Sequence, residues 1–321
     1  MSEKECIKIN LRKAAVIGCG FVGSSTAFAL MQSGLFSEMV LIDADKDRAE
    51  GEALDISHGT PFARPMKIYA GTYQDITDAA VIIITAGANQ KPDETRLDLV
   101  AKNTKIMRSV IDEIMKYGCE GILLIVSNPV DILTYEALKI SGLPKNRVIG
   151  SGTVLDTGRL KSELAEHLGV DSRSVHAFII GEHGDSEIAA FSSANVSGVP
   201  LSHVCEMRGY FNHESSMREI AETVKNSAYE IIEKKKATYY GISMAVRRIC
   251  EAIVRDEKSI LPVSAMLDGI YGLTDIVLSM PTIIGASGAE GQMPITLNPD
   301  EQALLQQSAH ILKEVIHKIE S

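Results

Sequence analysis

The chain has 321 residues, of which 45% are hydrophobic and 23% are charged, and its formal net charge is −10. This length favours two domains over one core, and the composition is that of a globular protein rather than a disordered or fibrous one. An acidic chain without a basic block is a poor electrostatic match for nucleic acid or anionic lipid, so these partners are not expected.

Short apolar runs alternate with helical patterns through the first half of the chain. Strand-like runs fall at 14–18, 39–43, 81–85, 122–126 and 148–149, and small and apolar residues recur at helical spacing over 21–32. The amphipathic stretch 94–117 predicts a helix with one buried face. Because parallel strands are buried on both faces and are joined by helical crossovers, this half is predicted to be a Rossmann-type, doubly wound parallel sheet.

The second half has a different pattern. We predict a helix at 160–168, a strand at 176–181 that ends in a glycine-flanked loop, and a long helical zone at 214–255 with a break near 237–241. A strand-rich stretch follows at 259–294, and Asn298 is expected to cap a terminal helix that runs to residue 319. The fold class is therefore α/β, with a doubly wound N-terminal domain at 1–148 and an α+β C-terminal domain at 149–321.

The cysteines and the start of the chain indicate the compartment. The five cysteines, Cys6, Cys19, Cys119, Cys205 and Cys250, are odd in number and form no C-x-x-C pair. This argues against a disulfide framework or a zinc site and favours buried thiols in a reducing compartment. Residues 1–13 have no signal-peptide core, and the apolar runs are too short to cross a membrane. We expect a cytoplasmic protein with no bound metal.

Residues 18–23 read G-C-G-F-V-G, which is a G-x-G-x-x-G pattern between a strand-like run and a helix. Gly18 would permit the tight turn, Gly20 the approach of a pyrophosphate, and Gly23 the close packing of helix and strand. The helix N-terminus would offer N–H groups to the phosphates. Asp43 ends the next strand, where its carboxylate would bind ribose hydroxyls and repel a 2′-phosphate. The pattern predicts NAD as the cofactor; the alternative is a glycine-rich turn without a ligand.

Four charged residues suit the reduction of a 2-keto acid. Such a reaction needs a cation for the carboxylate, a donor to polarise the ketone, and an acid that titrates near neutrality. Asp156 and Arg159 lie on one face at the start of a predicted helix, where such a pair is usually a surface ion pair. His183 lies between glycines at a strand end, and Arg96 begins the long amphipathic helix. Taken singly, none of these four residues would indicate a catalytic site.

Five motifs together resemble the lactate/malate dehydrogenase family. They are G-C-G-F-V-G at 18–23, T-A-G-A-N-Q-K-P at 85–92, S-N-P-V-D at 127–131, G-S-G-T-V-L-D-T at 150–157 and I-G-E-H-G-D-S at 180–186. The resemblance runs from about residue 13 to residue 317 and is greatest to bacterial members that act on lactate. It implies a reversible, NADH-dependent reduction of pyruvate to (S)-lactate in fermentative glycolysis.

The resemblance also implies roles for individual residues. His183 would donate the proton, Asp156 would orient its ring and stabilise the imidazolium, and Arg159 would hold the substrate carboxylate. Arg96 would polarise the ketone from a closing loop at 88–95. The other implied substrate contacts are Gln90, Asn128, Asp131 and Thr238, with a cis bond between Asn128 and Pro129. The residues implied along NAD are Gly18, Gly20, Val22, Gly23, Asp43, Arg48, Tyr73, Gly87, Ala88, Ser109, Val126, Asn128 and Ser151.

Gln90 lies where the family distinguishes its substrates. Malate dehydrogenases of the family carry Arg there, because oxaloacetate brings a second carboxylate. A neutral Gln would leave that charge unpaired in a closed site, so pyruvate is preferred. The alternatives are a dehydrogenase of another 2-hydroxy acid, such as malate or 2-hydroxyisocaproate, and a non-catalytic relative on the same fold.

Some positions depart from the family pattern. Bacterial members are often homotetramers that are activated by fructose 1,6-bisphosphate. His176 matches the His of that allosteric site, but Lys161 replaces the Arg and offers phosphate a point charge without a planar fork. Two interpretations of Lys161 and His176 therefore remain: an effector site, or an ordinary pair of surface residues. Asp93 and Lys236 stand where Gly is common, and in the loop this would slow closure.

Overall fold

The computed structural model describes residues 9–88 and 96–320, and the chain divides into two compact units. Unit 1 comprises the residues up to Gly150 together with Tyr239–Ser259 and Ile284–Glu290. Unit 2 comprises Ser151–Thr238, Ile260–Ile283 and the residues from Gly291 onward. No helix within the described ranges is both long enough and apolar enough to span a bilayer.

Unit 1 is built on a parallel sheet whose strand order is β3-β2-β1-β4-β5-β6. The strands are β1 (Asn10–Ile17), β2 (Glu38–Ile42), β3 (Lys67–Ala70), β4 (Ala79–Ile84), β5 (Ile122–Ile125) and β6 (Val148–Gly150). Strand order reverses between β1 and β4, and in open α/β sheets ligands bind at the carboxyl ends of strands at such a switch point. The predicted doubly wound sheet is confirmed.

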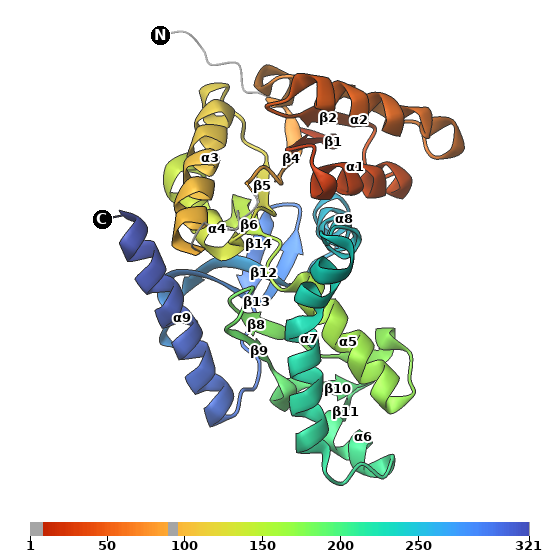
Figure 1. Ribbon diagram of the computed structural model, residues 1–321, viewed down its shortest axis with the longest axis vertical. Coiled ribbons are helices and arrows are strands. Elements are labelled where there is room, and N and C mark those ends of the chain that lie inside the picture. Colours follow the sequence, from red (N-terminus) through yellow and green to blue (C-terminus); the bar gives the residue numbers. More distant parts are fainter. Residues whose placement is uncertain (1–8, 89–95, 321) are drawn as a thin grey trace. The chain divides into compact units, whose positions relative to one another are not determined.

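Helices cover both faces of this sheet (Figure 1). They are α1 (Phe21–Ser33), α2 (Lys46–His58), α3 (Arg96–Lys116), α4 (Val130–Ser141) and α8 (Tyr240–Val254). Met107, Ile111 and Ile114 of α3 form the buried core of one face with strand residues such as Ile82 and Leu123. The sequence patterns did not single out β3, α2 or α4.

Helix α8 follows the chain of unit 2 in sequence but packs in unit 1, beside α1 (Figure 1). The hydroxyl of Thr26 donates to the hydroxyl of Ser243 at 3.3 Å, and the rings of Phe21 and Tyr239 stack at 5.4 Å. The chain therefore returns to unit 1 after residue 238, and a single domain boundary placed along the sequence does not describe this return.

Unit 2 combines antiparallel strands with four α-helices of different lengths. Its larger sheet contains β8 (Ile179–Gly181), β9 (Glu187–Ala189), β12 (Ser259–Asp268) and β13 (Thr274–Gly285). The end of β13 and most of β14 (Gly288–Gln292), which pairs with β13, are assigned to unit 1. A small sheet contains β7 (Val175–His176), β10 (Asn195–Val196) and β11 (Val199–Pro200). The helices are α5 (Val154–Leu168), α6 (Leu201–Met207), α7 (His213–Lys235) and α9 (Pro299–Glu320). The core lies between α5, α7 and the small sheet.

The single strand predicted at 176–181 is wrong. His176 pairs with Asn195 in the small sheet, whereas Gly181 pairs with Ser279 in the larger one, so the chain changes sheets between them. The predicted helix at 160–168 begins earlier, at Val154, and therefore includes Asp156 and Arg159. Apolar periodicity missed this turn because its buried residues, Asp156 and Thr157, are polar.

Two predicted helix boundaries are confirmed. The break near 237–241 lies between α7 and α8, where Lys236 adopts a left-handed φ of 70°. That conformation favours glycine, so the side chain of Lys236 is held at a backbone position that suits glycine better. At the start of α9, the Glu301 N–H donates to Asn298 Oδ1 at 2.8 Å and the Asn298 N–H donates to Glu301 Oε2 at 3.0 Å. Asn298 is thus the helix cap, in a reciprocal capping box.

Candidate active site

The glycine turn between β1 and α1 excludes side chains at two positions. Gly18 has a φ of 97°, and a Cβ there would lie 2.6 Å from the Ala86 nitrogen. A Cβ on Gly23 would lie 1.8 Å from the Gly18 carbonyl oxygen. Gly20, the N-cap of α1, has open space around its missing Cβ and makes no side-chain capping bond. The turn therefore leaves the helix N-terminus accessible to an anion.

Asp43 joins this turn to the end of β2. Its carboxylate accepts hydrogen bonds from the Cys19 N–H at 2.6 Å and the Asp45 N–H at 2.9 Å. The carboxylate is only partly buried and keeps acceptor capacity for hydroxyl donors. Burial, together with the nearby Asp43, raises the pKa of the Cys19 thiol to about 12. Cys19 is thus a neutral packing residue, as we expected of the cysteines; Cys6 lies outside the described residues.

Asn103 of α3 is a structural residue that the sequence analysis missed. Its side chain is 4% exposed. Its Oδ1 accepts from the Ala88 N–H at 2.8 Å, and its Nδ2 donates to the Asn128 carbonyl at 2.8 Å. The signal was present, because Asn103 interrupts the apolar face of α3 between Val100 and Met107. One amide thus fixes two loops at the carboxyl edge of the sheet, and the Asn128–Pro129 bond there is cis, as predicted.

The remaining residues expected along NAD lie in unit 1, apart from Ser151 at the start of unit 2. Val22 is on α1, Arg48 on α2, Tyr73 in the short helix Tyr73–Ile76, Ser109 on α3 and Val126 directly after β5. Gln90 lies outside the described residues. Arg96 is the first residue of α3 and Asp131 is a buried residue of α4.

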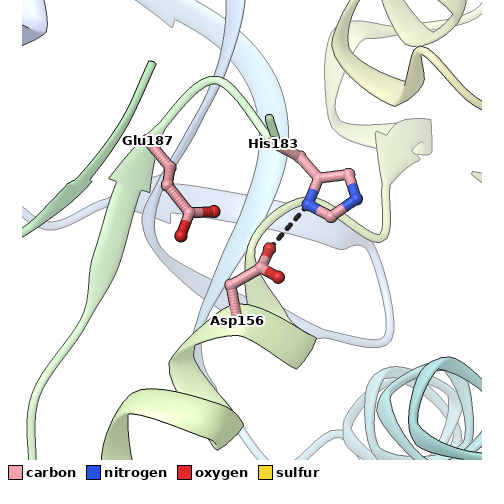
Figure 2. Close-up of side chains that lie close together, drawn as sticks. All are labelled: Asp156, His183 and Glu187. Carbon is pink, nitrogen blue, oxygen red and sulfur yellow. Dashed lines mark hydrogen bonds and ion pairs between the residues drawn. The ribbon is translucent and has the colours of Figure 1, made fainter. Parts of the chain in front are cut away.

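In unit 2, Asp156 connects a histidine and an arginine (Figure 2). His183 Nδ1 lies 2.6 Å from Asp156 Oδ2, and Arg159 Nη1 donates to Asp156 Oδ1 at 2.8 Å. Asp156 is 2% exposed, whereas the imidazole of His183 is 26% exposed. Burial acts to raise the pKa of Asp156, but His183 and Arg159 outweigh it and hold this pKa below its ordinary value. The pair is therefore an ionised acid behind a reachable imidazole.

Local hydrogen bonds position the two members of this pair. The Ile179 N–H donates to Thr157 Oγ1 at 2.9 Å, which ties β8 to the helix that carries Asp156. Gly181 has a φ of 88°, which turns the chain after β8, and the Glu182 N–H donates to Ser308 Oγ of α9 at 2.9 Å. Nδ1 of His183 is directed at Asp156, so Nε2 points away from both carboxylates drawn in Figure 2.

Glu187 is the second residue that the sequence analysis missed. It lies on β9, and its carboxylate, the Asp156 carboxylate and the His183 ring have ligand-type atoms within 4.8 Å of one another (Figure 2). Burial, followed by repulsion from Asp156, raises the pKa of Glu187 to about 8. Because Nδ1 already bonds to Asp156 and Glu187 favours its neutral form, the cluster suits proton handling better than a metal ion.

The two residues of the expected effector site lie in unit 2. Lys161 is on α5, and its partial burial lowers the pKa of its ammonium group. His176 is exposed on β7. Thr238, expected to line the substrate pocket, lies in the short segment between α7 and α8.

Comparison with known proteins assigns the family. Residues 12–150 match the lactate/malate dehydrogenase NAD binding domain, and residues 153–321 match the lactate/malate dehydrogenase alpha/beta C-terminal domain. The chain belongs to the lactate/malate dehydrogenase family, and NAD is its cofactor.

Similar proteins extend over nearly the whole chain. An L-lactate dehydrogenase of Acetivibrio thermocellus is 54% identical over 97% of this chain and 98% of its own length. One of Priestia megaterium is 52% identical over 94% of this chain and 95% of its own length. Among solved structures, a minor L-lactate dehydrogenase from Enterococcus mundtii in the ligands-bound form has a TM-score of 0.93 at 46% identity. It covers 96% of this chain, and 98% of that protein is matched.

Proposed function

We propose that this protein is an L-lactate dehydrogenase, which reduces pyruvate to (S)-lactate with NADH and catalyses the reverse reaction. The observation that carries the proposal is the contact of 2.6 Å between His183 Nδ1 and the buried, ionised Asp156. Such a pair holds a proton ready for a ketone oxygen. The similar proteins named L-lactate dehydrogenase support the same substrate.

Unit 1 has the features that NAD requires. The open space at Gly20 and the uncapped start of α1 fit a pyrophosphate, and Asp43 fits ribose hydroxyls. Val22, Arg48, Tyr73, Gly87 and Ser109 would line the rest of the cofactor. Bound NAD supplies the carbon that gives or takes a hydride.

The residues of unit 2 would anchor the substrate and transfer its proton. Arg159 keeps guanidinium N–H groups beyond the one bonded to Asp156, and these would bind the carboxylate of pyruvate. His183, protonated before the reaction, gives its Nε2 proton to the ketone oxygen as the C–O double bond becomes a C–O single bond. Asp156 holds the Nδ1–H and stabilises the imidazolium before transfer.

The other residues expected to contact the substrate would polarise its ketone group and form the walls of its pocket. Arg96 would stabilise the charge that develops on the ketone oxygen, and Asn128 would donate to the same region. Asp131 and Thr238 would bound the substrate pocket. Gln90, a neutral residue, would accept the methyl end of pyruvate and disfavour the second carboxylate of oxaloacetate.

Substrate specificity provides the test of this function. NADH oxidation is followed with pyruvate, oxaloacetate and 2-ketoisocaproate, and kcat/KM is expected to be highest for pyruvate. Gln90→Arg should move the preference toward oxaloacetate, because the guanidinium pairs with the second carboxylate. A preference of the wild type for oxaloacetate or 2-ketoisocaproate would establish a different 2-hydroxy acid. No oxidation with any of the three would favour the non-catalytic alternative.

We further propose a cytoplasmic homotetramer that acts in glycolytic fermentation and responds to fructose 1,6-bisphosphate. Lys161 and His176 are the residues that would contact the effector phosphates. A phosphate near Lys161 would offset the loss of charge that its burial favours. Fructose 1,6-bisphosphate should lower the KM for pyruvate and favour the tetramer in analytical ultracentrifugation, and Lys161→Ala should remove both effects. If the wild type shows neither, the effector site is absent.

A further inference from the structure

Glu187 occupies an unusual position for a carboxyl group. It lies on β9, the second strand of the hairpin whose turn contains His183, and its Oε1 is buried without a hydrogen-bond partner among the described residues. The Asp156 and His183 side chains lie beside it, with ligand atoms of all three within 4.8 Å (Figure 2). A buried carboxylate oxygen without a hydrogen-bond partner is costly when the group is ionised, and the cost is much smaller when the carboxyl group is neutral.

Four charged or titratable residues act on the ionisation of Glu187: Asp156 and Arg159 on α5, His183 in the turn after β8, and Lys225 on α7. The pocket that Glu187 lines also contains the titratable residues His213, Glu214 and Arg218 of α7 and Asp300 and Glu301 of α9. Asp156 opposes ionisation of Glu187, while His183, Arg159 and Lys225 favour it. Burial and Asp156 prevail, and they raise the pKa of Glu187 to about 8. Glu187 is therefore mostly neutral at pH 7.

We propose that Glu187 is a positioning residue of the proton-transfer pair, a neutral acid whose ionisation in alkaline solution holds the proton on His183. This inference rests on the proposed role of His183 as the proton donor. In the proposed role, Glu187 contacts neither substrate nor cofactor. Its carboxyl group acts on His183 through the electrostatic potential at the imidazole.

The direction of the effect follows from the charges. When Glu187 is neutral, it adds nothing to the stabilisation of the imidazolium by the ionised Asp156. When Glu187 loses its proton, a second negative charge near the ring favours the imidazolium further, so His183 stays protonated to a higher pH. Pyruvate reduction needs the protonated ring, and lactate oxidation needs the neutral ring. Ionised Glu187 thus extends reduction into alkaline solution and delays oxidation.

Glu187→Gln separates this role from a merely structural one, because the amide keeps the shape of the carboxyl group but never ionises. The kcat for both directions is measured from pH 6 to pH 10. At pH 6.5 the variant should match the wild type within about twofold, because Glu187 is neutral there in both proteins. In alkaline solution the midpoint of pyruvate reduction should move down by about one pH unit, and lactate oxidation should become faster than in the wild type near pH 8.

Two controls sharpen the test. Glu219→Gln removes one carboxylate from an exposed site on α7 and should leave both profiles unchanged. Glu187→Asp keeps an ionisable group and should restore part of the wild-type profile. A loss of rate in both directions at all pH values would indicate a structural role and overturn the proposal.

A spectroscopic readout is independent of turnover. In protein labelled with carboxyl-13C glutamate, the signal absent from the Glu187→Gln spectrum belongs to Glu187, and it should titrate near pH 8. Titration near the ordinary value of a glutamate would overturn the proposal. This measurement needs no substrate, so it tests the role of Glu187 independently of the proposed function. Failure of the proposed function would be seen differently, as a wild-type protein without activity on pyruvate.

Discussion

The glycine turn of unit 1 and the His183 turn of unit 2 both follow a strand, but they are built from different kinds of interaction. In unit 1 the decisive atoms are backbone: a Cβ on Gly23 would lie 1.8 Å from a carbonyl oxygen, and the turn leaves N–H groups open. In unit 2 the decisive atoms are side-chain charges, because Asp156 is buried and bonds to both His183 and Arg159. Substitutions should therefore act through volume in unit 1 and through charge in unit 2.

The largest effect is expected for a change of charge without a change of volume. Asp156→Asn should lower kcat for pyruvate reduction by roughly 10³-fold or more, because the imidazolium loses its buried counter-charge and its fixed tautomer. NADH binding, measured by fluorescence, should stay within a few-fold of the wild type. A decrease in kcat of less than tenfold would show that charge is not decisive in unit 2.

A change of volume without a change of charge should matter in unit 1. Gly23→Ala should destabilise the fold by about 3 kcal/mol in urea denaturation, because backbone atoms must shift to admit the methyl group. Gly20→Ala is the matched control, because open space surrounds that position. It should leave stability within about 1 kcal/mol of the wild type and weaken only NADH binding. Equal destabilisation by both substitutions would contradict the steric account.

Asn103 tests whether unit 1 also depends on a buried side chain. Asn103→Ala leaves the Ala88 N–H and the Asn128 carbonyl without their partner, so we expect a loss of about 2 kcal/mol in stability. The KM for pyruvate should rise, because Asn128 is less well held. Unchanged urea denaturation would mean that water replaces the amide at no cost.

The last prediction concerns the pH dependence of stability. The pKa of Glu187 is raised in the folded state to about 8, whereas the unfolded chain would have the ordinary glutamate value. Between these values the folded protein holds more protons than the unfolded chain, so this group makes stability fall as pH rises. The slope is at most about 1.4 kcal/mol per pH unit. Relative to the wild type, Glu187→Gln should flatten the decrease between pH 5 and pH 8; parallel curves would disagree with a raised pKa.

Sequence patterns predicted the regions where local signals are strong. Apart from β3, the parallel strands of unit 1 contain continuous apolar runs, and the glycine spacing fixes the turn whatever surrounds it. Long-range packing was beyond these patterns. Nothing near His176 indicates that the chain changes sheets after it, and nothing near Tyr240 indicates that α8 packs with α1.

The site residues divide in the same way. The Asp156–Arg159 pair was visible because both residues lie on one turn of a helix. The neighbour that modifies it, Glu187, was not, because its pKa depends on burial and on charges from other elements. Asn103 was detectable in principle, since a polar residue on the buried face of an amphipathic helix requires a partner.

The central claim, that His183 supplies the proton for pyruvate reduction, is tested most directly by single-turnover oxidation of bound NADH in His183→Asn. The account predicts a rate at pH 7 that is lower by about 10³-fold or more, with NADH affinity close to that of the wild type. A single-turnover rate within tenfold of the wild type would contradict it.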